Sequence, residues 1–464
     1  MGLFDVFVVN VAAPDIQSSL HSSAGELQLI IGGYAFTYAA FLVTGGRLGD
    51  RLGYRGLFIG GMVAFTLGSA ACGIAQSPAQ LVVARLAQGL SAALMVPQVL
   101  AQITALFPPD ERRKALAWFG VTIGLGAIAG QVLGGALVQA DLFGWGWRTV
   151  FFVNVPIGIA TVALAARLLP DRRSAAHPQL DLIGVLLVSG SLGLALVPLT
   201  LGHSEGWPSW MIALLCAAAP GFALALRYES RLARRGGQPV LDLSLFHARS
   251  FASGLVVNAG MFAYFGSVLL GLTLFLQVGL GLSALNAGLS FAPLGVAFAC
   301  TSLLAQPLIA RHGARVVTAG LVVAIAALGG LLLDVHLSGN ATDPARLAPL
   351  FFAIGIGNGI VMPALIGVSL SDVPPQKAGA AAGTLATSQQ FSVAAGVAVL
   401  SEIFFAALGS RPTEHSYVHA VQLVLALDIA LVGACFIASQ LLPRPARVRA
   451  REAEAEPAEA SDAA

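Results

Sequence analysis

The chain has 464 residues, of which 57% are apolar and 10% are charged, and its formal net charge at pH 7 is +2. Its mean hydropathy is +0.82, which excludes a set of soluble domains because too much apolar surface would face water. The composition indicates one body that crosses a membrane many times. The four cysteines all fall in apolar runs, which is typical of buried residues rather than of a disulfide or metal site: Cys72, Cys216, Cys300 and Cys435.

Hydropathy, turn residues and charges together predict an all-α membrane protein with 14 transmembrane helices. In chain order these spans cover residues 3–16, 28–45, 57–75, 79–104, 115–138, 149–169, 182–201, 210–228, 251–276, 286–309, 315–335, 347–370, 379–405 and 419–441. The first span is short, because only fourteen residues precede Asp15 and about 20 are needed to cross a bilayer. We therefore expect this helix to begin upstream of Met1.

Basic residues predict how the spans are oriented. With the N-terminus inside, the inner segments hold 21 of the 25 Lys and Arg residues and the outer segments hold three, while Arg85 is left within a span. The positive-inside rule then favours a multi-pass protein of the inner or plasma membrane with both termini in the cytoplasm. The tail at residues 443–464 begins with a basic stretch and continues with an acidic, Ala-rich one, and it is predicted to be disordered and cytoplasmic.

Two matched motifs indicate an internal repeat. The stretch GRLGDRLGYR at 46–55 has an echo in QPLIARHGAR at 306–315, and the MVP sequence ending at Pro97 has a counterpart 266 residues later in the VMP sequence ending at Pro363. The offset covers eight predicted helices. We therefore expect two pseudo-symmetric six-helix bundles, at 1–170 and 236–442, separated by a two-helix insert with the start of a linker at 171–235. Repeated halves around a midplane site are typical of alternating-access transporters.

Several stretches match one family pattern in chain order. They are GRLGDRLGYRG (46–56), RLAQGLSAALMVP (85–97), WRTVFFVNVPIG (147–158), LDLIGVLL (180–187), PVLDLSLF (239–246) and FLQVGLGLSALNAGLSFAP (275–293). On these motifs the chain resembles the major facilitator superfamily, specifically its fourteen-span drug:proton antiporter branch. The resemblance implies a proton-driven exporter and does not specify a substrate.

One motif departs from the family pattern. In the predicted fifth helix, GAIAGQVLGG at 126–135 has Gln131 where the antiporter motif usually has proline. The small residues of the motif are kept, and their spacing lets helices approach closely: Gly126, Gly130, Gly134 and Gly135. A proline-dependent bend does not follow, so an importer or facilitator of a small metabolite remains the alternative function.

The stretch at 46–56 is predicted to be a cytoplasmic loop that takes part in gating, through Gly46, Gly49, Asp50, Arg51, Gly53 and Arg55. Asp50 could cap or pair with the N-terminal end of a helix from the other half, a contact that would break when the protein opens. The alternative is a solvated basic loop, but such a loop does not need this many glycines.

Four ionisable residues within or near spans are predicted to take part in proton coupling: Asp5, Arg85, Asp428 and Glu402. Charges inside a membrane are costly and are functional candidates by default. The resemblance places a membrane-embedded aspartate at Asp5 and implies that Arg85 sets the protonation of a neighbouring carboxylate. The alternatives are a wetted helix end for Asp5, a structural arginine between helices, and a buried structural hydrogen bond for Asp428.

A substrate cavity is predicted from polar and aromatic residues at helical spacing. Gln88, Met95 and Gln98 share a face with Arg85. Aromatic stripes occur in the second and ninth spans, at Tyr34, Tyr38 and Phe41 and at Asn258, Met261, Phe262 and Phe265. Such stripes also arise from ordinary packing. If they face a cavity, they suit a lipophilic or cationic ligand.

The predicted function is therefore a proton-coupled secondary active transporter that exports small hydrophobic or cationic compounds by alternating access. A membrane receptor is a remote alternative, and so is an intramembrane enzyme, for which no HExxH motif is present. No GxxxxGK[ST] motif is present either, so protons are the expected coupling ion. We expect a small-molecule substrate and the lipid bilayer as partners, no nucleic acid, no metal or organic cofactor, and a monomer.

Overall fold

The computed structural model describes residues 1–170, 181–237, 239, 241–339, 343–374, 377–408 and 414–442. Within these ranges the chain is all-helical, as predicted. The first part contains α1 (Gly2–Leu20), α2 (Ala24–Leu52), α3 (Tyr54–Gly73), α4 (Pro78–Leu106), α5 (Pro109–Ala140), the short 3-10 turns η1 (Leu142–Gly144) and η2 (Gly146–Arg148), α6 (Thr149–Phe152) and α7 (Asn154–Leu168). The predicted disordered tail at 443–464 lies outside the described residues.

The second part begins with a pair of helices, α8 (Leu182–Glu205) and α9 (Ser209–Arg234). It continues with η3 (Leu243–His247), α10 (Arg249–Leu274), the π-helical η4 (Phe275–Gly279), α11 (Ala284–Ser290), α12 (Ala292–Leu304), α13 (Gln306–His312), α14 (Ala314–Ser338), α15 (Pro344–Ser369), α16 (Ala378–Leu408) and α17 (Glu414–Ser439). Eleven helical stretches among the described residues are long and apolar enough to cross a membrane. The other predicted spans, 3–16, 115–138 and 182–201, lie on α1, α5 and α8.

Several predicted helix ends are wrong, because hydropathy marks where apolar sequence stops and not where backbone hydrogen bonding stops. Helix α1 continues past the exposed Asp15 to Leu20. The predicted loop at 46–56 is mostly helical, since α2 ends at Leu52 and α3 begins at Tyr54. Gly53 alone joins them, with φ 92°, a conformation that glycine adopts without strain. The predicted span at 286–309 is divided among α11, α12 and α13.

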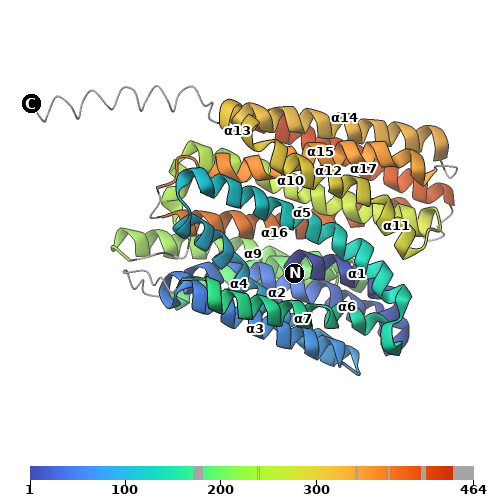
Figure 1. Ribbon diagram of the computed structural model, residues 1–464, viewed down its shortest axis with the longest axis horizontal. Helices are drawn as coiled ribbons and strands as arrows, with labels where there is room; N and C mark the ends of the chain where they lie inside the picture. Colours follow the sequence, from blue (N-terminus) through green and yellow to red (C-terminus); the bar gives the residue numbers. More distant parts are fainter. Residues whose placement is uncertain are drawn as a thin grey trace, which may run out of the picture.

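The helices form two groups with α5 and α16 between them (Figure 1). One group contains α1 to α4, α6 and α7, and the other contains α10, α12, α14, α15 and α17. Helix α5 packs on α1 in the first group and on α11 and α12 in the second, while α16 packs on α10 and α17 and also on α2. These two helices therefore form the seams along which the groups meet.

The helix pair α8–α9 covers one of these seams. Helix α8 packs on both α2 and α16, and a small apolar cluster joins Ala39 of α2, Val188 of α8 and Phe391 of α16. Near the turn between α8 and α9, the Trp207 indole donates a 2.6 Å hydrogen bond to the carboxylate of Glu402 on α16. The pair is therefore attached to the first group through α2 and to the seam helix α16.

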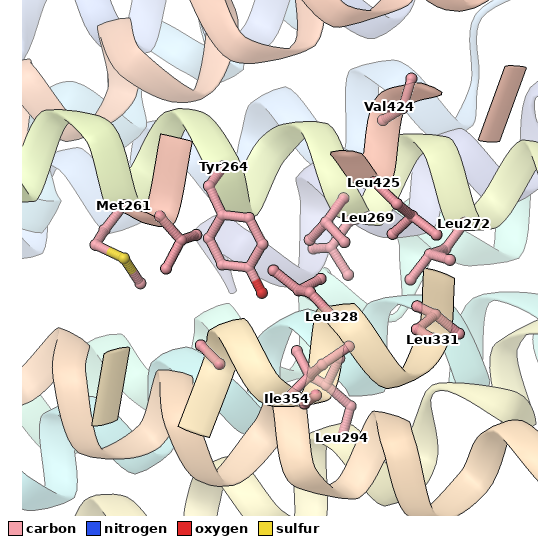
Figure 2. Close-up of a cluster of buried hydrophobic side chains, with 14 of the residues drawn as sticks. Met261, Tyr264, Leu269, Leu272, Leu294, Leu328, Leu331, Ile354, Val424 and Leu425 are labelled. Carbon is pink, nitrogen blue, oxygen red and sulfur yellow. The ribbon is translucent and has the colours of Figure 1, made fainter. Parts of the chain in front are cut away.

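The largest apolar core lies in the second group. Figure 2 shows part of it, where Leu269 and Leu272 of α10 face Leu328 and Leu331 of α14. Small residues bring the helices of this group close together. A methyl group at Gly355 of α15 would overlap the carbonyl oxygen of Leu294 on α12 and come within 2.8 Å of the neighbouring Ala297 side chain.

The close approach at Gly355 predicts a stability difference between two glycines of the same helix. Gly355→Ala should lower the melting temperature of the purified protein, because an overpacked contact costs about 1–3 kcal/mol. Gly367→Ala is the matched control: nothing lies within 4 Å of a methyl group there, so its melting temperature should stay equal or rise slightly. Equal losses in both variants would contradict the close contact between α12 and α15.

A polar contact ties the linker after α9 to the start of α16. The Lys377 ammonium lies 2.9 Å from the carboxylate of Asp242, and the backbone N–H of Ser244 donates to the same carboxylate over 2.9 Å. Partial burial opposes ionisation of Asp242, but these hydrogen bonds and the lysine charge outweigh it and lower its pKa below the ordinary value of 3.8. The contact therefore stabilises the ionised carboxylate.

This lowered pKa predicts the direction of a pH dependence. The contribution of Asp242 to stability should be fully present above pH 3.8 and should be lost as the pH falls through the lower value of the folded protein. It should not exceed about 1 kcal/mol, because Lys377 is partly exposed. Thermal unfolding of the wild type and of Asp242→Asn checks this. The difference between their melting temperatures should be constant near neutral pH and should shrink as the solution is acidified. A difference that grows under acid would contradict it.

Candidate functional site

The site is built around a buried ion pair in the first helix group. Asp5 of α1 and Arg85 of α4 are both fully buried, and one terminal nitrogen of the guanidinium donates to Asp5 Oδ2. The same nitrogen lies 2.8 Å from Gln88 Oε1, one turn further along α4. The structure thus brings together three predicted site residues that are up to 83 positions apart in the sequence.

Two amides complete the shell of Asp5. The Gln88 side chain donates to Asp5 Oδ1 over 3.1 Å, and the Asn154 side chain of α7 donates to the same oxygen over 2.9 Å. Gln88 is itself held by Ser69 of α3, whose hydroxyl oxygen accepts a 2.7 Å hydrogen bond from the amide. Both carboxylate oxygens therefore have donors, which is how a buried charge is compensated.

Arg85 is also held from the side of α2. Its Nε donates to the backbone carbonyl of Ile30 over 3.0 Å, and the guanidinium carbon lies 4.6 Å from the centre of the Tyr34 ring and 5.8 Å from that of Phe151. Cation–π attraction of this kind strengthens when the cation is desolvated. The second terminal nitrogen, Nη2, has no hydrogen-bond partner among the described residues. Its N–H groups are therefore unused donors in this conformation.

The sequence positions these side chains through its helix starts. Ser77 caps α4, since its side chain accepts from the N–H of Gln80, and Pro78 occupies the first turn. Ser23 and Glu26 form a capping box at the start of α2. Asn154 is the first residue of α7, where the helix is interrupted after α6. Because the helix starts are fixed, the side chains one to three turns later, such as Arg85 on α4, lie at a defined depth in the bundle.

Sequence reasoning missed Ser69 and Asn154. A serine within an apolar run is common in membrane helices and gave no signal. Asn154 did carry one, because it is an amide inside the apolar stretch WRTVFFVNVPIG, where an unpaired polar group would be costly. Tyr34 was predicted as part of a substrate cavity, and the structure buries it completely beside Arg85.

Other predicted cavity residues lie between helices. Gln98 is buried and donates 2.8 Å hydrogen bonds to the backbone carbonyls of Gly45 and Leu94, and Met95 packs against Gly61 of α3. In this conformation these two side chains serve helix packing. The polar face of α4 thus extends from the Asp5 cluster towards the end of α2.

A second set of predicted cavity residues lies along the seam formed by α16. Tyr38 of α2 faces the side-chain amide of Gln390 on α16, and Asn258 of α10 accepts a 3.1 Å hydrogen bond from Gln389. Met261 is buried on α10 near them in sequence, while Phe41, Phe262 and Phe265 are half-buried. Polar groups from three helices therefore gather where the two groups meet.

The predicted gating residues are placed as follows. Gly49 allows contact with Gln98, because a methyl group there would overlap the Gln98 amide, and Gly46 lies near Pro97. The Arg55 guanidinium donates a 2.5 Å hydrogen bond to the carbonyl of Ala166 at the end of α7. Arg51 is exposed. The side chain of Asp50 lies outside the described residues, so its predicted capping contact stays a prediction.

The glycines of the predicted fifth-helix motif face α1 and the interior. Gly130, Gly134 and Gly135 are buried and Gly126 is half-buried. A methyl group at Gly134 would come within 2.7 Å of Val8, three residues after Asp5. The kept glycines thus let α5 approach α1 beside the ion pair. The side chain of Gln131 lies outside the described residues.

The remaining predicted coupling residues are not part of this cluster. Asp428 is buried on α17 in the second helix group, and Glu402 binds Trp207 near the α8–α9 turn. Among the described residues, no group of three or more His, Cys, Asp and Glu side chains could hold a metal ion. The Asp5 cluster itself contains a carboxylate, a guanidinium and two amides, which are groups for acid–base and electrostatic chemistry.

Comparison with known proteins identifies the superfamily to which the chain belongs. The family model described as "Major Facilitator Superfamily" matches residues 1–397, and the chain belongs to this superfamily. The fold agrees with that of the human organic anion transporter MFSD10 (TETRAN), whose crystal structure aligns with a TM-score of 0.61 at 18% sequence identity, over 93% of this chain and 97% of that one. The protein is thus a multi-pass membrane transporter rather than an enzyme.

Relatives place it more narrowly. It is 39% identical over 414 residues to the "Probable actinorhodin transporter" of Streptomyces coelicolor, covering 89% of this chain and 72% of the relative. It is 34% identical to the cephamycin export protein CmcT of Amycolatopsis lactamdurans, over 89% of this chain and 84% of the relative. It is 32% identical to the tetracenomycin C resistance and export protein of Streptomyces glaucescens, over 88% and 74%. These names support an efflux transporter.

The buried pair predicts a non-additive effect on stability. Arg85→Gln should destabilise the protein by about 3–5 kcal/mol, because it leaves Asp5 buried without a compensating charge. The double variant Asp5→Asn with Arg85→Gln should recover most of that loss, since a neutral hydrogen-bonded set replaces the pair. Thermal unfolding of the purified variants measures both effects. If the losses of the single variants simply add in the double variant, the two residues are not paired.

Proposed function

We propose that the protein is a proton-coupled exporter of small hydrophobic or cationic compounds that works by alternating access. The observation that carries the proposal is the buried contact between Asp5 and Arg85, with Gln88 and Asn154 completing the shell of the carboxylate. In a chain of this family, an ionisable pair buried inside the membrane is a functional candidate, because protonation of the carboxylate would leave the arginine without its counter-charge.

The geometry supports a simple switch. In the observed conformation one guanidinium and two amide groups donate to the Asp5 carboxylate. The guanidinium also lies over the aromatic rings of Tyr34 and Phe151. Protonation of Asp5 would remove the charge that holds Arg85 and would weaken three charge-assisted hydrogen bonds at once. Five helices meet at the cluster, so this loss would loosen the packing of α1 and α4 against α2, α3 and α7.

Proton drive is energetically sufficient. Moving one charge through 100 mV supplies about 2.3 kcal/mol, and one pH unit adds about 1.36 kcal/mol. A hundredfold gradient of a neutral solute costs about 2.8 kcal/mol, at 1.4 kcal/mol for each factor of ten. One proton per substrate would therefore be enough under these conditions.

The seam at α16 is the proposed path for the substrate. Tyr38, Asn258, Gln389 and Gln390 bring polar and aromatic groups together from α2, α10 and α16. Such a surface suits a compound with a large apolar body and a few hydrogen-bonding groups. We extend to this chain the kind of compound named in its relatives, namely antibiotics such as actinorhodin, cephamycin and tetracenomycin C.

The proposed membrane arrangement has fourteen spans, with α1, α5 and α8 added to the eleven stretches identified by length and hydropathy. Two six-helix bundles and the α8–α9 insert would place both termini in the cytoplasm, as the distribution of basic residues favours. We propose a monomer that needs no cofactor besides the coupling proton. The alternative, an importer or facilitator, differs in the direction of transport and in its response to the gradient.

The deciding experiment is transport of a lipophilic cationic dye in inverted vesicles with an imposed pH gradient. Wild-type protein should accumulate dye only while the gradient is maintained. Asp5→Asn should reduce gradient-driven transport by at least about tenfold, equivalent to about 1.4 kcal/mol, because the neutral amide cannot exchange a proton.

The matched control is Asp15→Asn, which removes an exposed carboxylate from the same helix and should transport like the wild type. Dye accumulation that survives collapse of the gradient would rule out proton coupling. Full activity of Asp5→Asn, at an expression level equal to that of the wild type, would remove Asp5 from the mechanism. Dye movement in the opposite direction would favour the importer.

A further inference from the structure

The second helix group contains its own buried carboxylate. Asp428 lies near the middle of α17 and its side chain is fully buried. Neither of its oxygens accepts a hydrogen bond from any described residue, although the Ser267 hydroxyl of α10 lies beside it. This is the opposite of Asp5, both of whose oxygens have donors.

The surroundings of Asp428 are polar but uncharged. Tyr264, one turn from Ser267 on α10, has its hydroxyl 3.5 Å from the Asn358 amide nitrogen of α15. The oxygen of that amide and the hydroxyl of Ser267 also lack partners among the described residues. Figure 2 shows Tyr264 extending from α10 towards the helices that carry Leu328 and Ile354, within the apolar core. Hydrogen-bonding capacity is therefore left unused around the carboxyl group.

Compensating charges are far from this position along every helix concerned. On α10, α14, α15 and α16, every Arg, His, Asp and Glu residue lies within six residues of a helix end. The acidic residues on these helices are Asp334, near the end of α14, and Glu402, near the end of α16. The π-helical η4 contains no charged residue. On α17 itself, Glu414, His415 and His419 lie at the start of the helix. Tyr264 of α10 interacts electrostatically with Asp428, and Cys435 lies two turns further along α17.

We propose that Asp428 is a second proton-binding site, occupied by a proton in the conformation described here. A carboxylate without a counter-charge is strongly disfavoured in an apolar interior, even with one hydroxyl beside it, and the group is neutralised instead. The neutral carboxyl group has an O–H that an adjacent hydroxyl or amide oxygen can accept. Protonation is a simple acid–base step: the carboxylate and one proton give the carboxylic acid.

The two sites then differ in how the carboxyl group is compensated. In the first group three side chains donate to the carboxylate of Asp5, whereas in the second group a bound proton compensates Asp428. Release of the second proton requires α17 to move relative to α10 so that water reaches the carboxyl group. A second site at Asp428 would give each helix group its own proton carrier and so deepens the proposed function. Only the transport part of the inference rests on that function.

The charge state can be measured without transport. Infrared spectra of the purified full-length protein in lipid, with carbon-13-labelled aspartate, should show the carbonyl stretch of a protonated carboxyl at neutral pH. This part needs no variant to fold. The band should vanish in Asp428→Asn and persist in Asp5→Asn and in the control Asp334→Asn. Its absence from the wild type, or its persistence in Asp428→Asn, would overturn the proposal. Loss of the band on adding Na⁺ at constant pH would overturn it in favour of a cation site.

The transport role has a separate readout. In vesicles, Asp428→Asn should still export dye under a pH gradient, but the number of protons moved per dye molecule should fall by one. An unchanged ratio would overturn the role of Asp428 in coupling even if the infrared band is present. Failure of the proposed function would show differently: the wild type would ignore the gradient while its infrared band remained.

Discussion

The arrangement of the first helix group depends on one interaction, the ion pair between Asp5 and Arg85. Two opposite charges have been removed from water, and either alone would be too costly to keep inside the bilayer. The fold compensates them with each other and with donors or acceptors from α2, α3, α4 and α7. Because the pair and its hydrogen-bond network join residues from α1, α2, α3, α4 and α7, they set the relative depth of these five helices.

The two seam helices lie between the ion pair and the second helix group. Helices α5 and α16 each pack on both groups, and α8 lies over the α2–α16 seam. Gly134 brings α5 next to the residues that follow Asp5, so the ion pair is close to one seam. Polar groups on α16 and α10 line the other. The ion pair therefore lies next to one of the two contacts between the groups.

Hydropathy was sufficient to predict the helical class and the position of nearly every helix, because the bilayer requires long apolar segments. It placed the ends poorly: α2 runs seven residues past its predicted end at 45, through glycine and arginine residues that remain helical. Asp5, Arg85 and Gln88 could be selected one by one, since polar residues stand out in apolar sequence. Their pairing, and the parts of Ser69 and Asn154, could not, because contacts between helices up to 149 residues apart depend on packing.

Gly53 has a mechanical consequence. A single residue connects α2 to α3, and a single glycine with positive φ, Gly313, likewise connects α13 to α14. A connection this short has no slack, so neither helix of a pair can slide along its neighbour; the pair can only pivot about the glycine. A shift of α2 along its axis at the seam would therefore displace the start of α3 as well, while a tilt of α2 could be absorbed at Gly53.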